Sequence, residues 1–250
     1  MHNTYTKIIA GIQRYFKESN HEKAVIGVSG GVDSALCLKL IVDSLGADKV
    51  TGLLMPEKGI SSDENAVHAK GLCQFLKVNF HVISINHFLT DFITLPWKPS
   101  ELGQINTKAR VRMCILYNFA NTHNALVIGT SNKSELAIGY GTKYGDLAGD
   151  IELIGDLYKH EVYKLAEHVG LPQEFIDKAP SAELYSGQTD EEEIGLSYKE
   201  IDNILKKLEE GNNKDDLINK GMNANSVHRI HRMVEINRHK SIPPHLIKAK

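Results

Sequence analysis

The chain has 250 residues, of which 42% are hydrophobic and 24% are charged, and its formal net charge at pH 7 is −2. This composition is ordinary for a globular protein, and the charge provides no overall attraction to nucleic acid or to an anionic membrane surface. The sequence contains no apolar run of about 18 residues, and its first residues lack the pattern of a signal peptide. We therefore expect one cytoplasmic domain over residues 1–250, with neither a nucleic-acid nor a membrane partner.

The three cysteines are widely separated and form no C-x-x-C motif. This argues against a disulfide framework, a structural zinc site and a sulfur-transfer pair. His68, His81 and His160 likewise lack metal-ligand spacing, so we interpret them as surface or core residues.

Residues 4–19 carry apolar side chains at helical spacing and predict a packing helix. Residues 24–34, AVIGVSGGVDS, predict a buried strand that enters a helix through a glycine turn, where free backbone N–H groups can bind phosphate. A Walker lysine is absent, but Ser29 and Ser34 offer hydroxyl donors, and Asp33 could hold a magnesium ion that bridges phosphate oxygens. The alternative interpretation is that Ser29 and Asp33 only cap the helix.

The following chain alternates predicted strands with predicted helices. Strands are expected at 50–55, 80–85, 125–129 and, in a short form, 151–154, and helices at about 62–77, 104–123 and 159–169. A loop is expected at 95–103, where two prolines stand. This order predicts an α/β fold with a doubly wound, mainly parallel sheet flanked by helices on both faces.

Polar residues follow the strand predicted at 125–129. They are Thr130, Ser131, Lys133, Ser134 and Glu135. Because ligands collect at the carboxyl ends of the strands in a doubly wound sheet, we expect this cluster to face the same crevice as the glycine turn.

The residues from about 180 onward differ in composition from the preceding chain. Residues 180–193 are acidic and poor in large apolar side chains, and they predict either a mobile surface loop or a lid that becomes ordered over a nucleotide. Helices are expected at 201–208 and 227–236. We accordingly divide the domain into a core at about 20–180 and a C-terminal helical part at about 181–250.

Several stretches together resemble the ammonia-dependent NAD synthetases, which belong to the PP-loop superfamily of ATP pyrophosphatases. These stretches are SGGVDS, NTKARVRM, GTSNKSE, TKYGD, LIGDLYKHEV and the HK pair near the end. The resemblance implies a C–N bond-forming ligase that adenylates the nicotinate carboxylate of deamido-NAD with ATP and Mg²⁺. Ammonia then attacks the adenylate to give NAD and AMP. The resemblance also implies a homodimer in which the deamido-NAD site is shared across the interface.

On the ATP side, the resemblance implies that the phosphates contact the loop formed by Gly27, Val28, Ser29, Gly30, Gly31, Val32, Asp33 and Ser34. It adds Thr130, Lys159 and Ser181 as ATP contacts, and Asp33 and Glu135 as the magnesium carboxylates. Judged without the family, Glu135 would be an ordinary exposed helix acid. Leu54 lies near a position where some relatives have an arginine, which leaves the adenosine contacts open.

On the deamido-NAD side, the matching residues are Arg110, Lys143, Asp150, His239 and Lys240. Judged without the family, His239 and Lys240 would be solvated charges of the tail. Asp146 and Asp150 are the candidates for binding and deprotonating ammonium. The catalytic set that the resemblance implies is Asp33, Glu135, Lys159 and Asp150.

Three other functions share parts of this pattern. An amidase of purine nucleotides of the GMP-synthetase type should have a different stretch after the fourth strand and a separate dimerisation domain. A sulfur-transfer tRNA enzyme should have catalytic cysteines, and a nucleotide-binding module without turnover would not need paired acids at Asp33 and Glu135. Because the synthetase pattern fills the chain, we expect free ammonia as the nitrogen donor, with a separate glutaminase partner left open.

Overall fold

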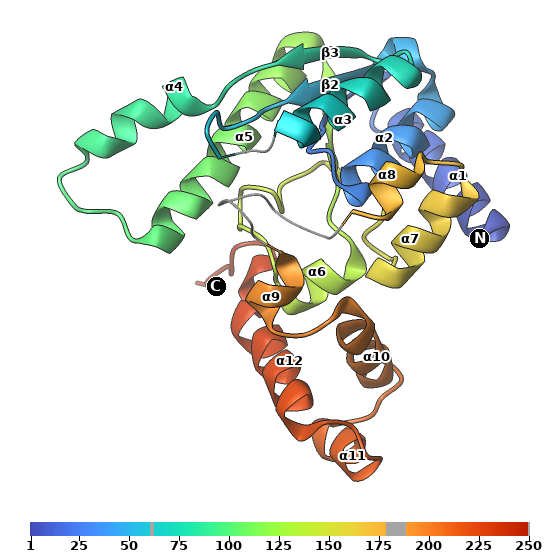
Figure 1. The fold of residues 1–250 in the computed structure, drawn as a ribbon, viewed down its shortest axis with the longest axis vertical. Coiled ribbons are helices and arrows are strands. Elements are labelled where there is room, and N and C mark those ends of the chain that lie inside the picture. The colour runs from blue at the N-terminus through green and yellow to red at the C-terminus, as the bar shows by residue number, and fades with distance from the viewer. Residues whose placement is uncertain (61–62, 179–188, 250) are drawn as a thin grey trace.

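The computed structural model describes residues 1–60, 63–178 and 189–249. Five strands form one sheet in the order β3-β2-β1-β4-β5, and every neighbouring pair is parallel (Figure 1). The strands are β1 (Lys23–Gly27), β2 (Val50–Leu54), β3 (Asn79–Val82), β4 (Ala125–Gly129) and β5 (Ile151–Glu152). The predicted parallel α/β sheet is therefore confirmed.

Helices precede, separate and follow the strands. Those up to β5 are α1 (His2–Glu18), α2 (Val32–Leu45), α3 (Asp63–Phe75), α4 (Asn86–Leu89), α5 (Glu101–His123) and α6 (Lys133–Ile138). Those after β5 are α7 (Lys159–His168), α8 (Gln173–Ile176), α9 (Asp190–Ile194), α10 (Tyr198–Glu209), α11 (Lys214–Asn219) and α12 (Ala224–Asn237). Short 3-10 turns are η1 (Ala47–Lys49), η2 (Thr90–Thr94) and η3 (Arg238–Lys240). None of the described helices combines the length and apolar character needed to cross a bilayer.

The two faces of the sheet are buried by different helices. Ala24 and Ile26 of β1 belong to an apolar cluster that includes residues of α1, α2, α3 and α7. Val25, which points to the other face, packs in a second cluster with Val111 and Ala120 of α5. Alternate side chains of a strand point to opposite faces, so both sides of β1 are covered, as a buried parallel sheet requires.

Several predicted boundaries were wrong. The segment 95–103 is not a loop throughout, because the Ser100 side chain accepts a hydrogen bond from Gly103 N at 3.1 Å and starts α5 at Glu101. The third and last strands are shorter than predicted, since β3 and β5 lie at the two edges of the sheet and pair on one side only. The short helices α4, α6, α8 and α11 were not predicted, because too few residues show a helical period there.

The C-terminal helices, which lie below the sheet in Figure 1, build a further apolar cluster. Ile201 and Leu205 of α10 and Ile230 of α12 pack there with Ile138 of α6 and with Tyr158, which precedes α7. Helix α10 is well defined, because Ser197 accepts from Glu200 N while the Glu200 carboxylate accepts from Ser197 N. This cluster holds α10 against the end of α6 and against Tyr158, the residue before α7.

Candidate active site at the carboxyl ends of the strands

The crevice between β1 and β4 is the point where the winding of the sheet reverses. From β1 the chain continues to β2 and β3 on one side, and it then returns to β4 and β5 on the other side. In open α/β sheets ligands bind beyond the carboxyl ends of the strands at such a switch point. The loops after β1, β4 and β5 are therefore the ones to inspect for a site.

The loop after β1 is a tight turn. Gly30 has φ +87°, and a Cβ atom there would lie 2.7 Å from the backbone oxygen of Asn65. Ser29 Oγ and Ser34 Oγ are 3.0 Å apart, and Ser34 Oγ donates to Gly31 O at 3.1 Å. The N-cap of α2 is Gly31, which argues against the interpretation that Ser29 and Asp33 serve only as caps. Asp33 thus lies in the first turn of α2 with its carboxylate available to other elements.

Asn132, at the end of the β4 loop, joins the two acids that the sequence singled out. Its side chain is fully buried, and its Nδ2 donates to Asp33 Oδ1 at 3.0 Å. Its Oδ1 accepts from Glu135 N at 3.0 Å, and Asn132 N donates to Glu135 Oε2 at 3.3 Å. The same asparagine therefore caps α6 and orients the carboxylates of Asp33 and Glu135.

Lys159, the first residue of α7, completes the cluster. Its Nζ lies 2.5 Å from Asp33 Oδ2 and 3.4 Å from Glu135 Oε1, and the residue is 1% exposed. Nζ also lies 5.0 Å from the centre of the Tyr198 ring, while the Tyr198 hydroxyl donates to Glu135 Oε1 at 3.3 Å. The N-terminal turns of α2, α6 and α10 thus converge on one buried ammonium group at the start of α7.

The cluster combines two carboxyl groups with one ammonium group. Burial lowers the pKa of Lys159, but Asp33 and Glu135 outweigh burial and raise it above its usual value. Burial raises the pKa of Glu135, Lys159 opposes this effect, and Asp33 and Asp190 add to it. A buried carboxylate with a raised pKa gains when a further cation binds, so the electrostatics favour a cationic ligand.

A site with two carboxylates, those of Asp33 and Glu135, fits an Mg²⁺ ion that is bound together with phosphate. The Asp33 and Glu135 side chains keep 19% and 16% exposure, so both remain open to the crevice. Within the described ranges, no three or more His, Cys, Asp or Glu side chains gather as a metal cage. Mg²⁺ commonly takes one or two carboxylates and fills its remaining positions with water and substrate phosphates, and this donor set fits that habit.

The structure shows less about the two remaining ATP candidates, Thr130 and Ser181. Thr130 directly follows β4 and is half-buried at the carboxyl end of the sheet. Its neighbour Ser131 donates from N to Glu152 Oε2 at 3.1 Å. Ser181, and most of the acidic segment predicted as loop or lid, lie outside the described residues, whereas residues 190–194 form α9.

Four of the five predicted deamido-NAD residues form a second cluster. Arg110 Nε and Nη2 each lie 3.3 Å from Lys143 O, and Lys143 Nζ donates to His239 O. Lys240 Nζ donates to Gly139 O at 2.7 Å and to Gly141 O at 2.9 Å. The structure therefore brings α5, the loop after α6 and the tail together at one place. Judged without the family, His239 and Lys240 would have been predicted to be solvated charges of the tail.

The two candidate bases lie in different surroundings. Asp150 Oδ2 accepts from Val127 N at 2.8 Å, and Oδ1 accepts from the Tyr117 hydroxyl at 3.2 Å. Asp146 accepts from Thr142 N at 3.0 Å, and burial raises the pKa of its carboxyl although Thr142 and Lys240 oppose the effect. Asp150 is thus bonded to the strand and to α5, whereas Asp146 belongs with the cluster of Lys240.

Sequence reasoning missed Asn132 and Tyr198 as parts of this site. The Asn-x-x-Glu spacing of Asn132 and Glu135 is a capping-box signal that could have identified the first. Tyr198 has no such signal, because it reaches Glu135 only through the packing of α10 on α6.

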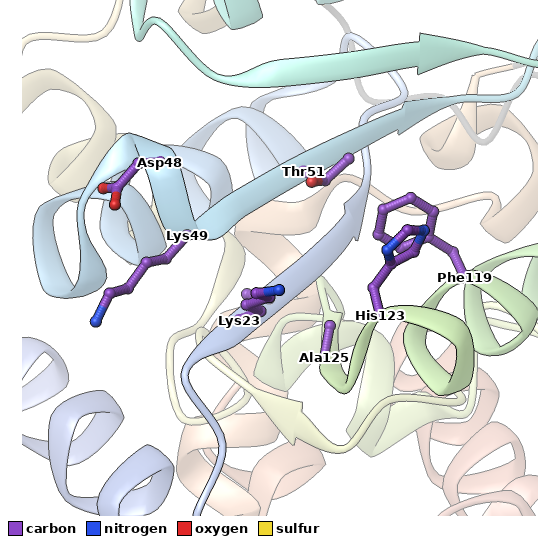
Figure 2. Close-up of a pocket in the computed structure, with 8 residues that line it drawn as sticks. Lys23, Asp48, Lys49, Thr51, Phe119, His123 and Ala125 are labelled. Carbon is purple, nitrogen blue, oxygen red and sulfur yellow. The ribbon is translucent and has the colours of Figure 1, made fainter.

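A pocket of about 140 Å³ lies at the opposite end of the sheet (Figure 2). Lys23, Thr51 and Ala125, which line it, stand at or near the amino ends of β1, β2 and β4. It is therefore separate from the crevice at the carboxyl ends.

Comparison with known proteins decides the family. The sequence model described as NAD synthase matches residues 4–244. The chain belongs to the NAD synthase family. A family relative from Methanocaldococcus jannaschii, named NH(3)-dependent NAD(+) synthetase, is 43% identical over 98% of this chain and 96% of its own length.

Two solved structures share the fold over nearly the whole chain. An NH3-dependent NAD synthetase from Campylobacter jejuni is 35% identical, with a TM-score of 0.85 over 99% of this chain and 98% of its own. A structure titled NMN synthetase, from Francisella tularensis, is 31% identical with a TM-score of 0.86 over 99% and 98% of the two chains. Family membership and fold therefore agree with the geometry of the crevice.

Proposed function

We propose that this protein is an ammonia-dependent NAD synthetase, a ligase that amidates deamido-NAD with ATP to give NAD, AMP and pyrophosphate. The observation that carries the proposal is the convergence of Asp33, Glu135 and Lys159 at the switch point of an NAD synthase fold. Relatives named NH(3)-dependent NAD(+) synthetase match along nearly their whole length, which supports the same reaction here.

The reaction explains why the crevice combines acids with a cation. A carboxylate is a poor electrophile, because its charge repels nucleophiles and no good leaving group is present. A nicotinate oxygen attacks the α-phosphorus of ATP, the bond to pyrophosphate breaks, and an acyl adenylate forms. Ammonia then adds to the carbonyl carbon, AMP leaves with the bridging oxygen, and a proton is lost. The protein contributes positioning and charge stabilisation.

On the ATP side, the backbone N–H groups from Gly27 to Ser34 and the Thr130 hydroxyl contact the triphosphate. Asp33 and Glu135 would hold Mg²⁺, which offsets the charge of the phosphates when it is bound. Lys159 Nζ, which contacts both acids, also contacts the phosphates and stabilises the departing pyrophosphate. Ser181 stays a predicted further ATP contact.

On the deamido-NAD side, Arg110 and Lys143 contact pyrophosphate or carboxylate oxygens, and His239 and Lys240 complete this cluster. Asp150 accepts hydrogen bonds from the ligand or orders it. Its present bonds to Val127 N and Tyr117 favour the ordering role. Asp146 stays the other candidate for binding and deprotonating ammonium, and the burial that raises the pKa of its carboxyl makes it the stronger base once it is ionised.

The protein forms a homodimer in this proposal. Large apolar side chains are exposed on an arm formed by α4, η2 and the start of α5, which projects away from the sheet in Figure 1. They are Phe88, Phe92, Ile93, Trp97 and Leu102. Exposed apolar groups of this kind mark interaction surfaces, and we propose a second copy as the partner that covers the arm. Because Arg110 lies on the same helix, α5, the deamido-NAD cluster would lie near the interface.

Product analysis tests the proposed function. The purified protein is incubated with ATP, Mg²⁺ and deamido-NAD, with either ammonium or glutamine, and the nucleotides are separated by chromatography. We expect NAD and AMP in equal amounts with ammonium and far less with glutamine. A parallel reaction with nicotinate mononucleotide tests the second candidate, suggested by the solved structure titled NMN synthetase. If only the mononucleotide is amidated, the enzyme class stands and deamido-NAD as substrate is wrong.

A further inference from the structure

A buried carboxylate of the C-terminal helices connects the starts of two helices that carry site residues. Asp202 of α10 is 3% exposed, and its Oδ1 accepts from the hydroxyl of Ser134 in α6. Its Oδ2 accepts from His160 N of α7 at 3.0 Å and lies 2.8 Å from His160 Nδ1. One side chain thus bonds α6 and α7 at the same time.

Ser134 carries the connection one step further. It is fully buried, and its Oγ accepts from Lys159 N at 2.9 Å while donating to Asp202. The first N–H groups of an α-helix have no partner within the helix, so Ser134 and Asp202 supply acceptors for two of them at the start of α7. Asp202 therefore holds the backbone of Lys159 through Ser134 and that of His160 directly.

The residues so held are the neighbours of the charged groups in the crevice. Ser134 precedes Glu135 in α6, and Lys159 is the first residue of α7. Tyr198, one turn before Asp202 on the same helix, donates to Glu135 Oε1 and places its ring 5.0 Å from Lys159 Nζ. Residues four apart share one face of a helix, so α10 presents Tyr198 and Asp202 together to the N-terminal turns of α6 and α7.

We propose that Asp202 is a positioning residue of the active site, which fixes the distance between Lys159 and Glu135 by binding the N-terminal turns of α6 and α7. It contacts neither of the two charged groups and acts through Ser134 and His160. The inference rests on the proposed roles of Lys159 and Glu135. It assigns to the C-terminal helical part a direct share in the geometry of phosphate binding.

The physical reason is that both contacts are made to a buried carboxylate and are charge-assisted. Without the carboxylate, Ser134 and His160 N lose their acceptor, and α7 can relieve this only by shifting or by admitting water. A shift of about 1 Å in a catalytic group can cost on the order of 100-fold in rate. Removal of the Asp202 carboxylate should therefore lower kcat, measured at saturating substrates.

The test compares Asp202→Ala, Asp202→Asn and Ile204→Ala. Ile204 is 1% exposed in the same helix and packs in the C-terminal apolar cluster, so Ile204→Ala supplies a destabilised control on α10. We expect kcat to fall at least about tenfold in Asp202→Ala, and to recover partly in Asp202→Asn, which keeps an acceptor for His160 N. Ile204→Ala should stay within about twofold when assayed well below its Tm.

A purely structural role would give the opposite pattern. If Asp202→Ala keeps kcat within about twofold once its lower Tm is taken into account, or if Ile204→Ala loses as much, the inference is wrong. Should Asp202→Ala fail to fold, Ser134→Ala removes the link to Lys159 N and carries the same expectation. If kcat survives in Lys159→Met and Glu135→Gln, the proposed site fails instead, so the two failures are distinguishable.

Discussion

Lys159 Nζ and Asp33 Oδ2 lie 2.5 Å apart although the two residues are 126 positions apart in the chain. The contact joins the loop after β1 to the start of α7, and Glu135 approaches the same ammonium at 3.4 Å. Asp33 is a candidate metal ligand and Lys159 is a candidate phosphate contact. Their contact therefore joins the proposed metal site to the proposed phosphate site.

Replacing Lys159 by Met should abolish the cationic centre while keeping a side chain of similar length. We expect kcat to fall about 100- to 1000-fold, as when one stabilising donor is removed from a transition state. Lys39→Met is the matched control, because Lys39 forms an ion pair of 2.5 Å with Asp43 within α2. Steady-state kinetics should show an ordinary kcat for this control, and an equal loss in both variants would contradict the role of Lys159.

Asn132→Ala removes the cap of α6 and the amide that holds Asp33. The loss of a cap costs about 1 kcal/mol in the free energy of unfolding. Asn213→Ala removes the equivalent capping box of α11, so its unfolding free energy should fall by a similar amount. Only Asn132→Ala should also weaken Mg²⁺-dependent ATP binding, measured by calorimetry. Equal binding by the two variants would show that Asn132 is a cap and nothing more.

Gly30→Ala introduces a side chain into the phosphate loop at φ +87°, where Cβ would lie 2.7 Å from Asn65 O. Gly211→Ala has a similar φ of +92° but meets no atom within 4 Å. Both variants should lose about 1 kcal/mol from backbone strain, and Gly30→Ala should lose more because its loop must move. ATP binding should fail in Gly30→Ala alone. Unchanged binding there would argue against phosphate contact by this loop.

Glu152 makes stability depend on pH. Burial raises the pKa of its carboxyl to about 7; Ser131 N opposes this shift and Asp146 adds to it. The folded state therefore keeps a proton that the unfolded chain releases near the ordinary value of 4.5, so the free energy of unfolding falls as pH rises from about 4.5 to 7. The full effect on the free energy of unfolding is at most about 3.5 kcal/mol.

The measurement is urea unfolding of the wild type and Glu152→Gln at pH 5 and pH 8. Gln keeps an acceptor for Ser131 N and cannot ionise. We expect the free energy of unfolding of Glu152→Gln, relative to that of the wild type, to be higher at pH 8 than at pH 5. The reason is that only the wild type loses stability as Glu152 ionises, and the difference should grow in proportion to that ionisation. A constant difference would mean that Glu152 does not titrate abnormally.

Much of the sheet could be predicted because its strands are apolar runs bounded by glycine or proline. Residues 24–26 and 125–128 illustrate this, since they are aliphatic and buried and each run is followed by a glycine. The edges were harder to predict, because β3 and β5 pair on one side and end early. The order of the strands also brought the loops after β1 and β4 together, as the polar cluster after residue 129 indicated.

The supports of the site could not be predicted in the same way. Asp33 and Glu135 stand in motifs, whereas Tyr198 and Asp202 act across the chain through the packing of α10 on α6 and α7. A contact between residues 63 or 68 positions apart leaves no local pattern. Only the tertiary structure shows that the C-terminal helices reach the crevice.

The most direct test of the account follows an oxygen atom. Deamido-NAD is prepared with ¹⁸O in its nicotinate carboxylate and converted with ATP, Mg²⁺ and ammonium, and the AMP is analysed by mass spectrometry. If the crevice activates the carboxylate by adenylation, each AMP carries one labelled oxygen and NAD keeps the other. AMP without label, while NAD still forms, would contradict the account.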